Sequence, residues 1–142
     1  MIYTSMTKKA LRLCFEAHKE QTDKSGMPYV FHPFHLAEQM TSEDTTVVAL
    51  LHDVVEDTGC TLEDLAKMGF GKEVCDAIAL MTHADGVDYM EYVGAIKGNP
   101  IARAVKLADL KHNSDLTRLD SVDEKALRRR EKYLKAIALL ED

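Results

Sequence analysis

Apolar residues recur at intervals of three and four positions along most of this chain, the spacing that places them on one face of an α-helix. Eight segments show the pattern, separated by capping residues, prolines and glycines. The predicted helices cover residues 6–21, 33–40, 44–57, 61–69, 72–81, 87–97, 100–116 and 122–141. No segment alternates with the period of two that marks a half-buried strand. The pattern therefore predicts an all-α bundle of about seven or eight helices.

Residues with known capping preferences mark the predicted helix ends. Thr61 opens the sequence TLED, in which a threonine and an acid three residues later form a capping box. Ser121 stands three residues before Glu124 and predicts the same kind of start for the last helix. Pro33 suits the first turn of the second helix, and it favours an extended backbone at His32 immediately before that helix.

The segment 44–57 is apolar nearly all round, which predicts a helix at the centre of the molecule. Its second half nevertheless carries four ionisable side chains along one edge. These are His52, Asp53, Glu56 and Asp57. Burying them without partners would cost several kcal/mol. Either a divalent cation compensates them, or this end of the helix faces water, an explanation weakened because acids oppose the helix dipole at a C-terminus.

A metal site needs ligands beyond one neighbouring His and Asp. His32 lies in the segment PYVFHP, and Asp109 interrupts an apolar run in KLADLKHN. Lys106, His112 and Asn113 are three or four residues from Asp109 and share its helix face. Taken singly, His32 and Asp109 are each better explained by an ordinary polar role than by metal binding. The recurrence of His, then His-Asp, then Asp, each on or beside a helix, favours a metal site.

Length and composition narrow the alternatives. With 142 residues the chain is predicted to form one domain, residues 1–142. It has 18 Lys and Arg residues against 24 Asp and Glu, a formal net charge of -6. This charge repels phosphate backbones and anionic membranes, so we expect neither nucleic acid nor a membrane as partner. Three cysteines without CxxC spacing and the lack of a leader pattern predict a cytoplasmic protein.

Three extended motifs refine the metal-site hypothesis. The sequence resembles the HD-domain metal-dependent phosphohydrolases, and KSGMPYVFHP, LLHDVVEDT and KLADLKHN resemble the three hydrolase motifs of the RelA/SpoT family, in that family's order and approximate spacing. The resemblance covers residues 10–119. Long members of the family continue into a synthetase domain, so this chain is similar to a stand-alone small alarmone hydrolase.

The resemblance implies a metal site, a reaction and a substrate. The residues matching the family's ligands to manganese are His32, His52, Asp53 and Asp109. Glu56 and Asp57 match residues that act in the proton transfers that activate water. The reaction removes the 3′-pyrophosphate from (p)ppGpp and leaves GDP or GTP. The expected substrate contacts are Lys24, Ser25, Lys106 and Asn113. For Lys106, a solvent-exposed lysine is an equally good interpretation.

The chain departs from the family pattern at three positions. Asp23 stands where the family commonly has an arginine that contacts guanine, and Leu110 and Asp115 replace two further arginines. Exchanging arginine for aspartate near a polyphosphate substitutes repulsion for a bidentate donor. Guanine specificity is therefore less secure than the metal site.

Two alternatives to the alarmone reaction stay open on the sequence. One is an HD-type phosphohydrolase acting on another nucleotide or small phosphate compound. The other is a nucleotide-binding module without turnover, which the two acids beside the ligands argue against. Tyr89 and Tyr92 are spaced to stack on a base, but packing is the better default for such a pair. The basic run ALRRREKYL is best explained as a solvated helix face.

Overall fold

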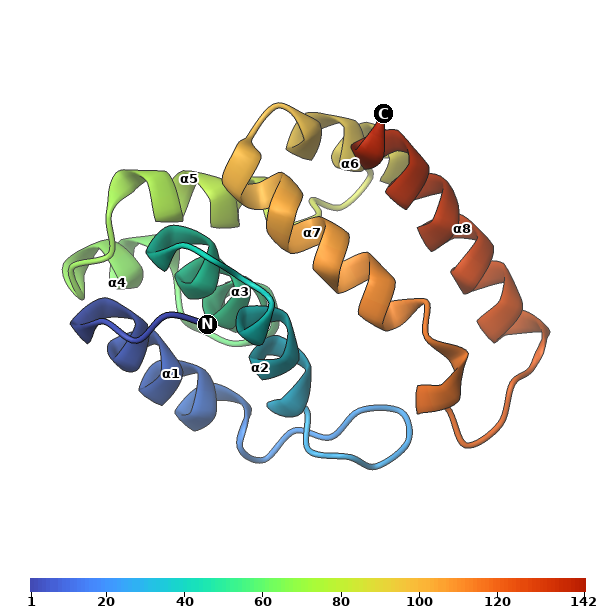
Figure 1. Ribbon diagram of the computed structural model, residues 1–142, viewed down its shortest axis with the longest axis horizontal. Coiled ribbons are helices and arrows are strands. Elements are labelled where there is room, and N and C mark those ends of the chain that lie inside the picture. Colours follow the sequence, from blue (N-terminus) through green and yellow to red (C-terminus); the bar gives the residue numbers. More distant parts are fainter.

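The computed structural model describes all 142 residues as helices joined by short loops (Figure 1). The elements are α1 (Ser5–His18), α2 (Phe31–Glu38), α3 (Glu43–Asp57), α4 (Leu62–Lys67), α5 (Lys72–Met81), α6 (Tyr89–Lys97), α7 (Pro100–Asn113), the 3₁₀ turn η1 (Leu116–Arg118) and α8 (Glu124–Glu141). No sheet forms, and one isolated antiparallel bridge joins Thr22 to Pro28 between α1 and α2. The predicted all-α fold is confirmed.

Helix α3 is the central element, as its composition predicts. It packs against α1, α2, α5 and α7, while α8 lies along α6 and α7 on the far side of the molecule (Figure 1). Every residue from Thr46 to Val54 is buried. The hydrophobic core is one cluster of 26 buried residues, to which all the α-helices contribute. Ser42 caps α3 by accepting a hydrogen bond from the Thr45 amide at 3.2 Å, and Glu43 and Asp44 suit the positive end of the helix dipole.

The start of α2 differs from the prediction in a way that matters for the site. Val30 is the N-cap and Phe31 the first helical residue, so His32 is inside the helix and not extended. Pro33 takes the third position of the first turn. There its missing N–H removes no helical hydrogen bond, because the first amides of a helix have no partner within it. The helix therefore begins before the proline, and His32 is held by regular backbone.

Other helix ends also differ from the predicted ones. Asp123, not Ser121, caps α8, because its carboxylate accepts from the Ala126 amide at 2.8 Å. Helix α1 ends at His18 and α7 at Asn113, each earlier than predicted. Beyond Asn113, Asp115 accepts from the Thr117 amide and starts the separate 3₁₀ turn. The Thr61 capping box at the start of α4 is confirmed.

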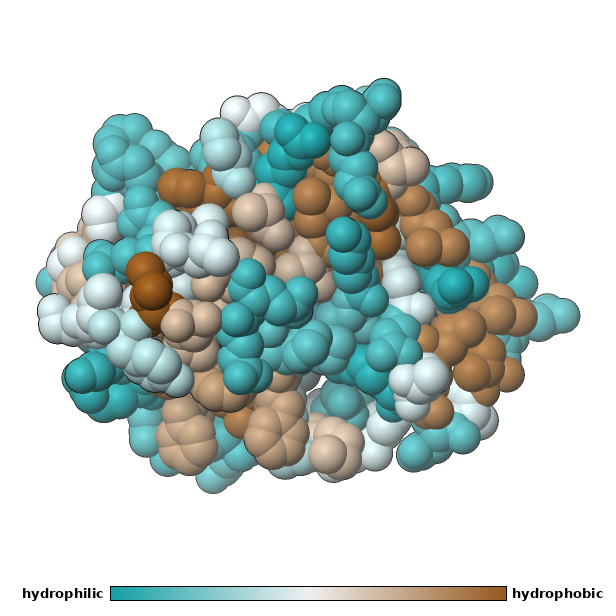
Figure 2. Space-filling view, in the orientation of Figure 1, coloured by the Kyte–Doolittle hydropathy of each residue, from teal (hydrophilic) through white to brown (hydrophobic).

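Polar side chains cover most of the displayed face, with apolar side chains gathered in patches between them (Figure 2). The helices are too short or too polar for any of them to cross a lipid bilayer.

Candidate metal centre

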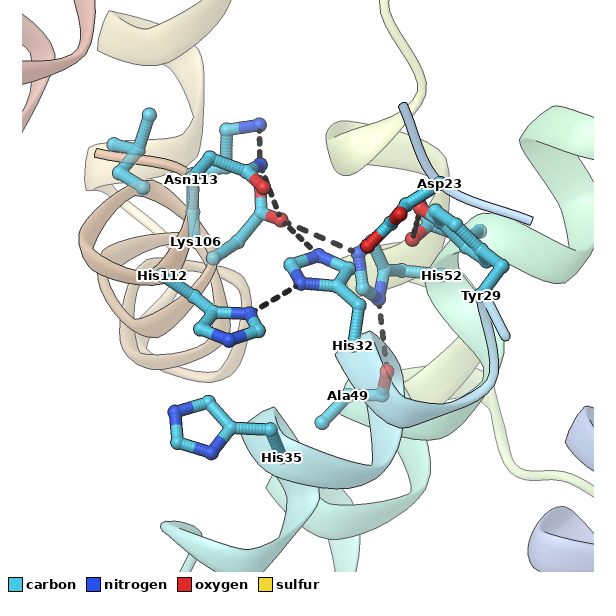
Figure 3. Close-up of polar contacts among 12 residues, drawn as sticks. Asp23, Tyr29, His32, His35, Ala49, His52, Lys106, His112 and Asn113 are labelled. Atoms are coloured by element: carbon cyan, nitrogen blue, oxygen red, sulfur yellow. Dashed lines mark hydrogen bonds and ion pairs between the residues drawn. The ribbon is translucent and has the colours of Figure 1, made fainter. Parts of the chain in front are cut away.

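Helices α2, α3 and α7 each direct a potential ligand to one buried point. One ligand atom from each of His32, His52 and Asp109 lies within 4.8 Å of the other two, and all three residues are buried (Figure 3). Asp53 lies at the edge of this group, with Oδ1 3.2 Å from His52 Nε2. The structure thus brings together all four residues predicted as ligands, from positions up to 77 residues apart.

The hydrogen bonding of the His52 ring is the arrangement expected of a metal ligand. Its Nδ1 lies 2.9 Å from the Ala49 carbonyl oxygen, which only accepts, so Nδ1 bears the proton. Its Nε2 is buried without a hydrogen-bond partner. Burial opposes protonation of this imidazole, but Asp53 and Asp109 outweigh burial and raise its pKa. The raised pKa reflects the negative charge of the two carboxylates at this point. A metal ion would compensate that charge in place of the proton and bind the Nε2 lone pair of the neutral imidazole, so the donor set fits a divalent metal.

His32 is oriented by two contacts. Its Nε2 is 2.9 Å from Asp109 Oδ1, and its Nδ1 is 2.7 Å from Nδ1 of His112 (Figure 3). Burial and the Arg118 charge lower the pKa of His112 to about 4, so His112 is neutral near pH 7. Only one proton fits between the two Nδ1 atoms. If His32 donates it, His112 accepts and His32 Nε2 is free to bind a metal.

Asp109 is held as a carboxylate by its surroundings. Burial alone would raise its pKa, but Lys106 and the two histidines outweigh burial and lower it. Lys106 Nζ lies 3.0 Å from Oδ2, and Asn113 Nδ2 donates to Oδ1 at 3.2 Å. The Lys106 side chain is only 12% exposed and its ammonium lies 5.3 Å from the centre of the Tyr92 ring. The interpretation of Lys106 as solvent-exposed is therefore wrong.

Tyr29 supports the fourth predicted ligand and was missed in the sequence. Its hydroxyl donates to Asp53 Oδ2 at 2.6 Å, which leaves Oδ1 facing the cluster. Burial and the Asp53 charge raise the pKa of Tyr29, so the phenol stays a donor. In the sequence, the only indication of this role was the position of Tyr29 in PYVFHP, three residues before His32. A residue at this distance can reach the same site once the helix starts at Phe31.

The two predicted proton-transfer residues lie one turn beyond His52 and Asp53 and are more exposed than these two, although neighbouring groups still remove part of their solvent. Partial burial and the Asp53 charge raise the pKa of both Glu56 and Asp57. A carboxyl with a raised pKa exchanges protons closer to neutral pH, as general acid-base chemistry requires. Glu56 lines a cavity of about 140 Å³ that also contacts Asp109. The alternative explanation, that this end of the helix faces water, does not hold for His52 and Asp53, which are buried.

The four predicted substrate contacts divide between two cavities beside the cluster. Lys24, Ser25 and Asn113 line a cavity of about 330 Å³ that reaches His32. Lys106 and Asn113 line the smaller cavity that contains Glu56. Asn113 therefore lines both cavities. Tyr89, which packs on Tyr92 with ring centres 5.8 Å apart, also lines the smaller cavity.

Comparison with known proteins places this arrangement in a family. A family model described as HD domain matches residues 10–114. The chain is 35% identical over 140 residues to a "Probable GTP pyrophosphokinase" of Mycobacterium leprae, covering 89% of this chain and 18% of that protein. It is 31% identical over 121 residues to the "Bifunctional (p)ppGpp synthase/hydrolase SpoT" of Escherichia coli, covering 75% and 17%. The chain thus spans less than a fifth of the length of these curated relatives.

A solved structure matches over a larger share of its length. It is described as "A metazoan ortholog of SpoT hydrolyzes ppGpp and plays a role in starvation responses". The TM-score is 0.76 at 26% sequence identity, and the match covers 99% of this chain and 85% of that one.

Removing the Glu56 charge is expected to stabilise the metal-free protein. Because its pKa is raised on folding, the folded state holds this proton to higher pH than the unfolded chain, and the free energy of unfolding falls as pH rises between the two pKa values. Glu56→Gln should therefore melt above wild type in EDTA at about pH 7.5, with the gain lost below the ordinary value of 4.5. Glu131→Gln, exposed on α8, is the control. A gain independent of pH would contradict the assignment.

Tyr29→Phe is expected to weaken metal binding without disturbing the fold, because it deletes only the hydroxyl that orients Asp53. Loss of such a supporting hydrogen bond typically costs about tenfold to a hundredfold in metal affinity. Calorimetric titration with Mn²⁺ measures the change. Tyr3→Phe, at a residue 63% exposed, serves as control. Equal affinities for Tyr29→Phe and wild type would show that Tyr29 does not support the site.

Proposed function

The chain belongs to the HD-domain family, and from that membership we propose that it is a metal-dependent phosphohydrolase that removes the 3′-pyrophosphate of (p)ppGpp. The observation that carries the proposal is the unpartnered, buried His52 Nε2 facing Asp109 beside His32. The names of the relatives support the substrate: both SpoT of Escherichia coli and the metazoan protein are described as acting on ppGpp.

We assign the cation to His32, His52, Asp53 and Asp109, the four side chains that surround the buried point. Histidine nitrogen and carboxylate oxygen suit Mn²⁺, the metal we propose, and also other divalent ions. When bound, such an ion supplies Lewis acidity and favours deprotonation of water at neutral pH. Four protein ligands leave room for further ligands on an ion that prefers about six.

Other residues around this point are assigned to the proton transfers of the reaction. In the proposed reaction, water adds to the inner phosphorus of the 3′-diphosphate, the bond from that phosphorus to ribose O3′ breaks, and O3′ takes up a proton. We assign to Glu56, which lines the same cavity as Asp109, the role of taking a proton from the water at its carboxylate. Asp57 provides a second carboxyl one residue along. Pyrophosphate and GDP or GTP are the products.

The substrate contacts Lys24, Ser25, Lys106 and Asn113 stay predictions, and the structure qualifies one of them. The Lys106 ammonium is engaged by Asp109, so its contribution to an incoming phosphate is shared with that carboxylate. The cytoplasmic location and the single domain also stay predictions.

A second candidate keeps the reaction and changes the base. The Asp23 carboxylate accepts hydrogen bonds from the amides of Ser25 and Met27, at 2.8 and 3.0 Å, and offers no donor to guanine. The donor that an arginine would offer to guanine O6 and N7 is therefore missing, and the second candidate is hydrolysis of the adenine counterpart, or of another nucleotide with a phosphorylated ribose, alongside (p)ppGpp.

Release of pyrophosphate from ppGpp is the expected activity. Purified protein with Mn²⁺ should release it, and EDTA treatment or Asp109→Ala should reduce the rate by about a hundredfold or more, because a missing charged ligand disables the metal site. Lys111→Ala, at an exposed position two residues along the same helix, is the matched variant expected to retain the rate.

The same assay with the adenine analogue separates the two candidates. A kcat/KM at least about tenfold higher for guanine supports the first, and equal values support the second. No release from either compound by folded, metal-loaded protein would contradict the proposed function.

A further inference from the structure

Arg118 lines the 330 Å³ cavity and contacts two separate segments of the chain there, and no role was predicted for it. One guanidinium nitrogen, Nη1, donates to the His112 carbonyl oxygen at 3.0 Å and to Asn113 Oδ1 at 3.3 Å. The other, Nη2, lies 3.9 Å from Asp23 Oδ2. The Arg118 and Asp23 side chains are only 26% and 23% exposed. Arg118 thus connects the end of α7 to the loop between α1 and α2.

Asp23 organises that loop from the other side. Its Oδ1 accepts from the amides of Ser25 and Met27, and Gly26 between them has a φ of 79°, a conformation that glycine adopts without strain. Ser25 Oγ donates to the Arg118 carbonyl oxygen at 3.0 Å. The loop and the η1 turn are therefore tied by side chains and backbone together, and they lie side by side in Figure 1.

The orientation of Asn113 depends on Arg118. Arginine only donates, so the Asn113 atom that faces Nη1 must be the oxygen. The amide nitrogen then faces Asp109 Oδ1, to which it donates at 3.2 Å. Arg118 is the only protein group that donates to Asn113 Oδ1. Without it, the residue shared by both cavities would lose one of the two contacts that fix it.

The Asp23–Arg118 pair also separates two spaces. Both residues, with His32, line the 330 Å³ cavity and a second cavity of about 390 Å³ on the outer side, toward Phe31 and His35. The pair therefore forms part of the wall between them. We expect a shorter side chain at either position to connect the two cavities.

We propose that Arg118, with Asp23 as its counter-charge, is a positioning residue that fixes the nucleotide-binding geometry of the inner cavity by holding Asn113 and the 22–28 loop. The inference rests on the proposed function for the class of ligand, a nucleotide with a phosphorylated ribose. It assigns the aspartate at position 23 a role in binding through Arg118 instead of a direct contact with the base.

The test compares Arg118→Ala, Asp23→Ala, the double variant and Arg118→Lys. Kinetics of the Mn²⁺-loaded protein give kcat and KM. With diamagnetic Ca²⁺ in place of Mn²⁺, calorimetry gives the Kd of ppGpp and NMR follows the Asn113 side-chain amide. Arg128→Ala is the matched control, since Arg128 is 68% exposed on α8 and forms an ion pair only with Glu124, at 3.8 Å.

We expect Arg118→Ala to raise Kd and KM about tenfold, the scale of one charge-assisted contact, with kcat within about twofold of wild type. Asp23→Ala should shift them in the same direction, and the double variant should be no worse than Arg118→Ala, because the two residues act as a unit. Arg118→Lys should recover only part of the loss, since an ammonium does not reproduce the guanidinium fork. The Asn113 amide resonances should move in Arg118→Ala and not in Arg128→Ala.

Additive effects in the double variant, or an Arg118→Ala protein indistinguishable from Arg128→Ala, would overturn the inference. If Arg118→Ala fails to fold, Arg118→Lys and Asp23→Asn carry the test. Failure of the proposed function shows separately, as a wild type that binds ppGpp and releases no pyrophosphate. In that case Kd and the Asn113 resonances still decide the role of Arg118. A wild type that binds no phosphorylated nucleotide would overturn both.

Discussion

The rest of the site depends on one buried imidazole nitrogen, His52 Nε2, which has no hydrogen-bond partner. It lies 3.2 Å from Asp53 Oδ1 and 4.0 Å from Asp109 Oδ1, in a region with almost no solvent access. A buried polar atom that lacks a hydrogen bond costs stability, and two carboxylates beside it cost more unless a positive charge compensates them. The interior of the bundle is thus arranged around a charge that the chain itself supplies only in part, through Lys106.

The surrounding residues limit what that charge can be. Ala49 fixes the proton of His52 on the far nitrogen, His112 contacts the far nitrogen of His32, and Tyr29 occupies the outer oxygen of Asp53. Each of these contacts leaves the inner atom of its partner facing the same point. Supporting contacts of this kind are typical of metal sites, in which they set tautomer and orientation. Binding a proton at this point, instead of a metal ion, would not require supporting contacts to three different side chains.

The sequence predicted which side chains cluster at this point better than it predicted the residues that contact and orient them. His52, Asp53 and Asp109 interrupt apolar helical runs, and such interruptions stand out against a regular period. Tyr29 and Arg118 do not interrupt an apolar helical run. Tyr29 precedes α2, whose start was predicted too late, and Arg118 follows α7, whose end was predicted too late. The end of α7 is followed by a short turn that one side-chain hydrogen bond starts, the one that Asp115 accepts from the Thr117 amide, whereas α2 starts after its N-cap Val30 without any side-chain cap. The hydrophobic period contains no information about such bonds.

The central claim is that these side chains hold one divalent cation, and anomalous diffraction from crystals grown with Mn²⁺ tests it most directly. We expect a single strong peak within about 2.3 Å of His32 Nε2, His52 Nε2 and a carboxylate oxygen of Asp109. Asp53 should approach the same peak. A metal-saturated crystal with no peak at this point, or with peaks only at exposed acids, would contradict the claim.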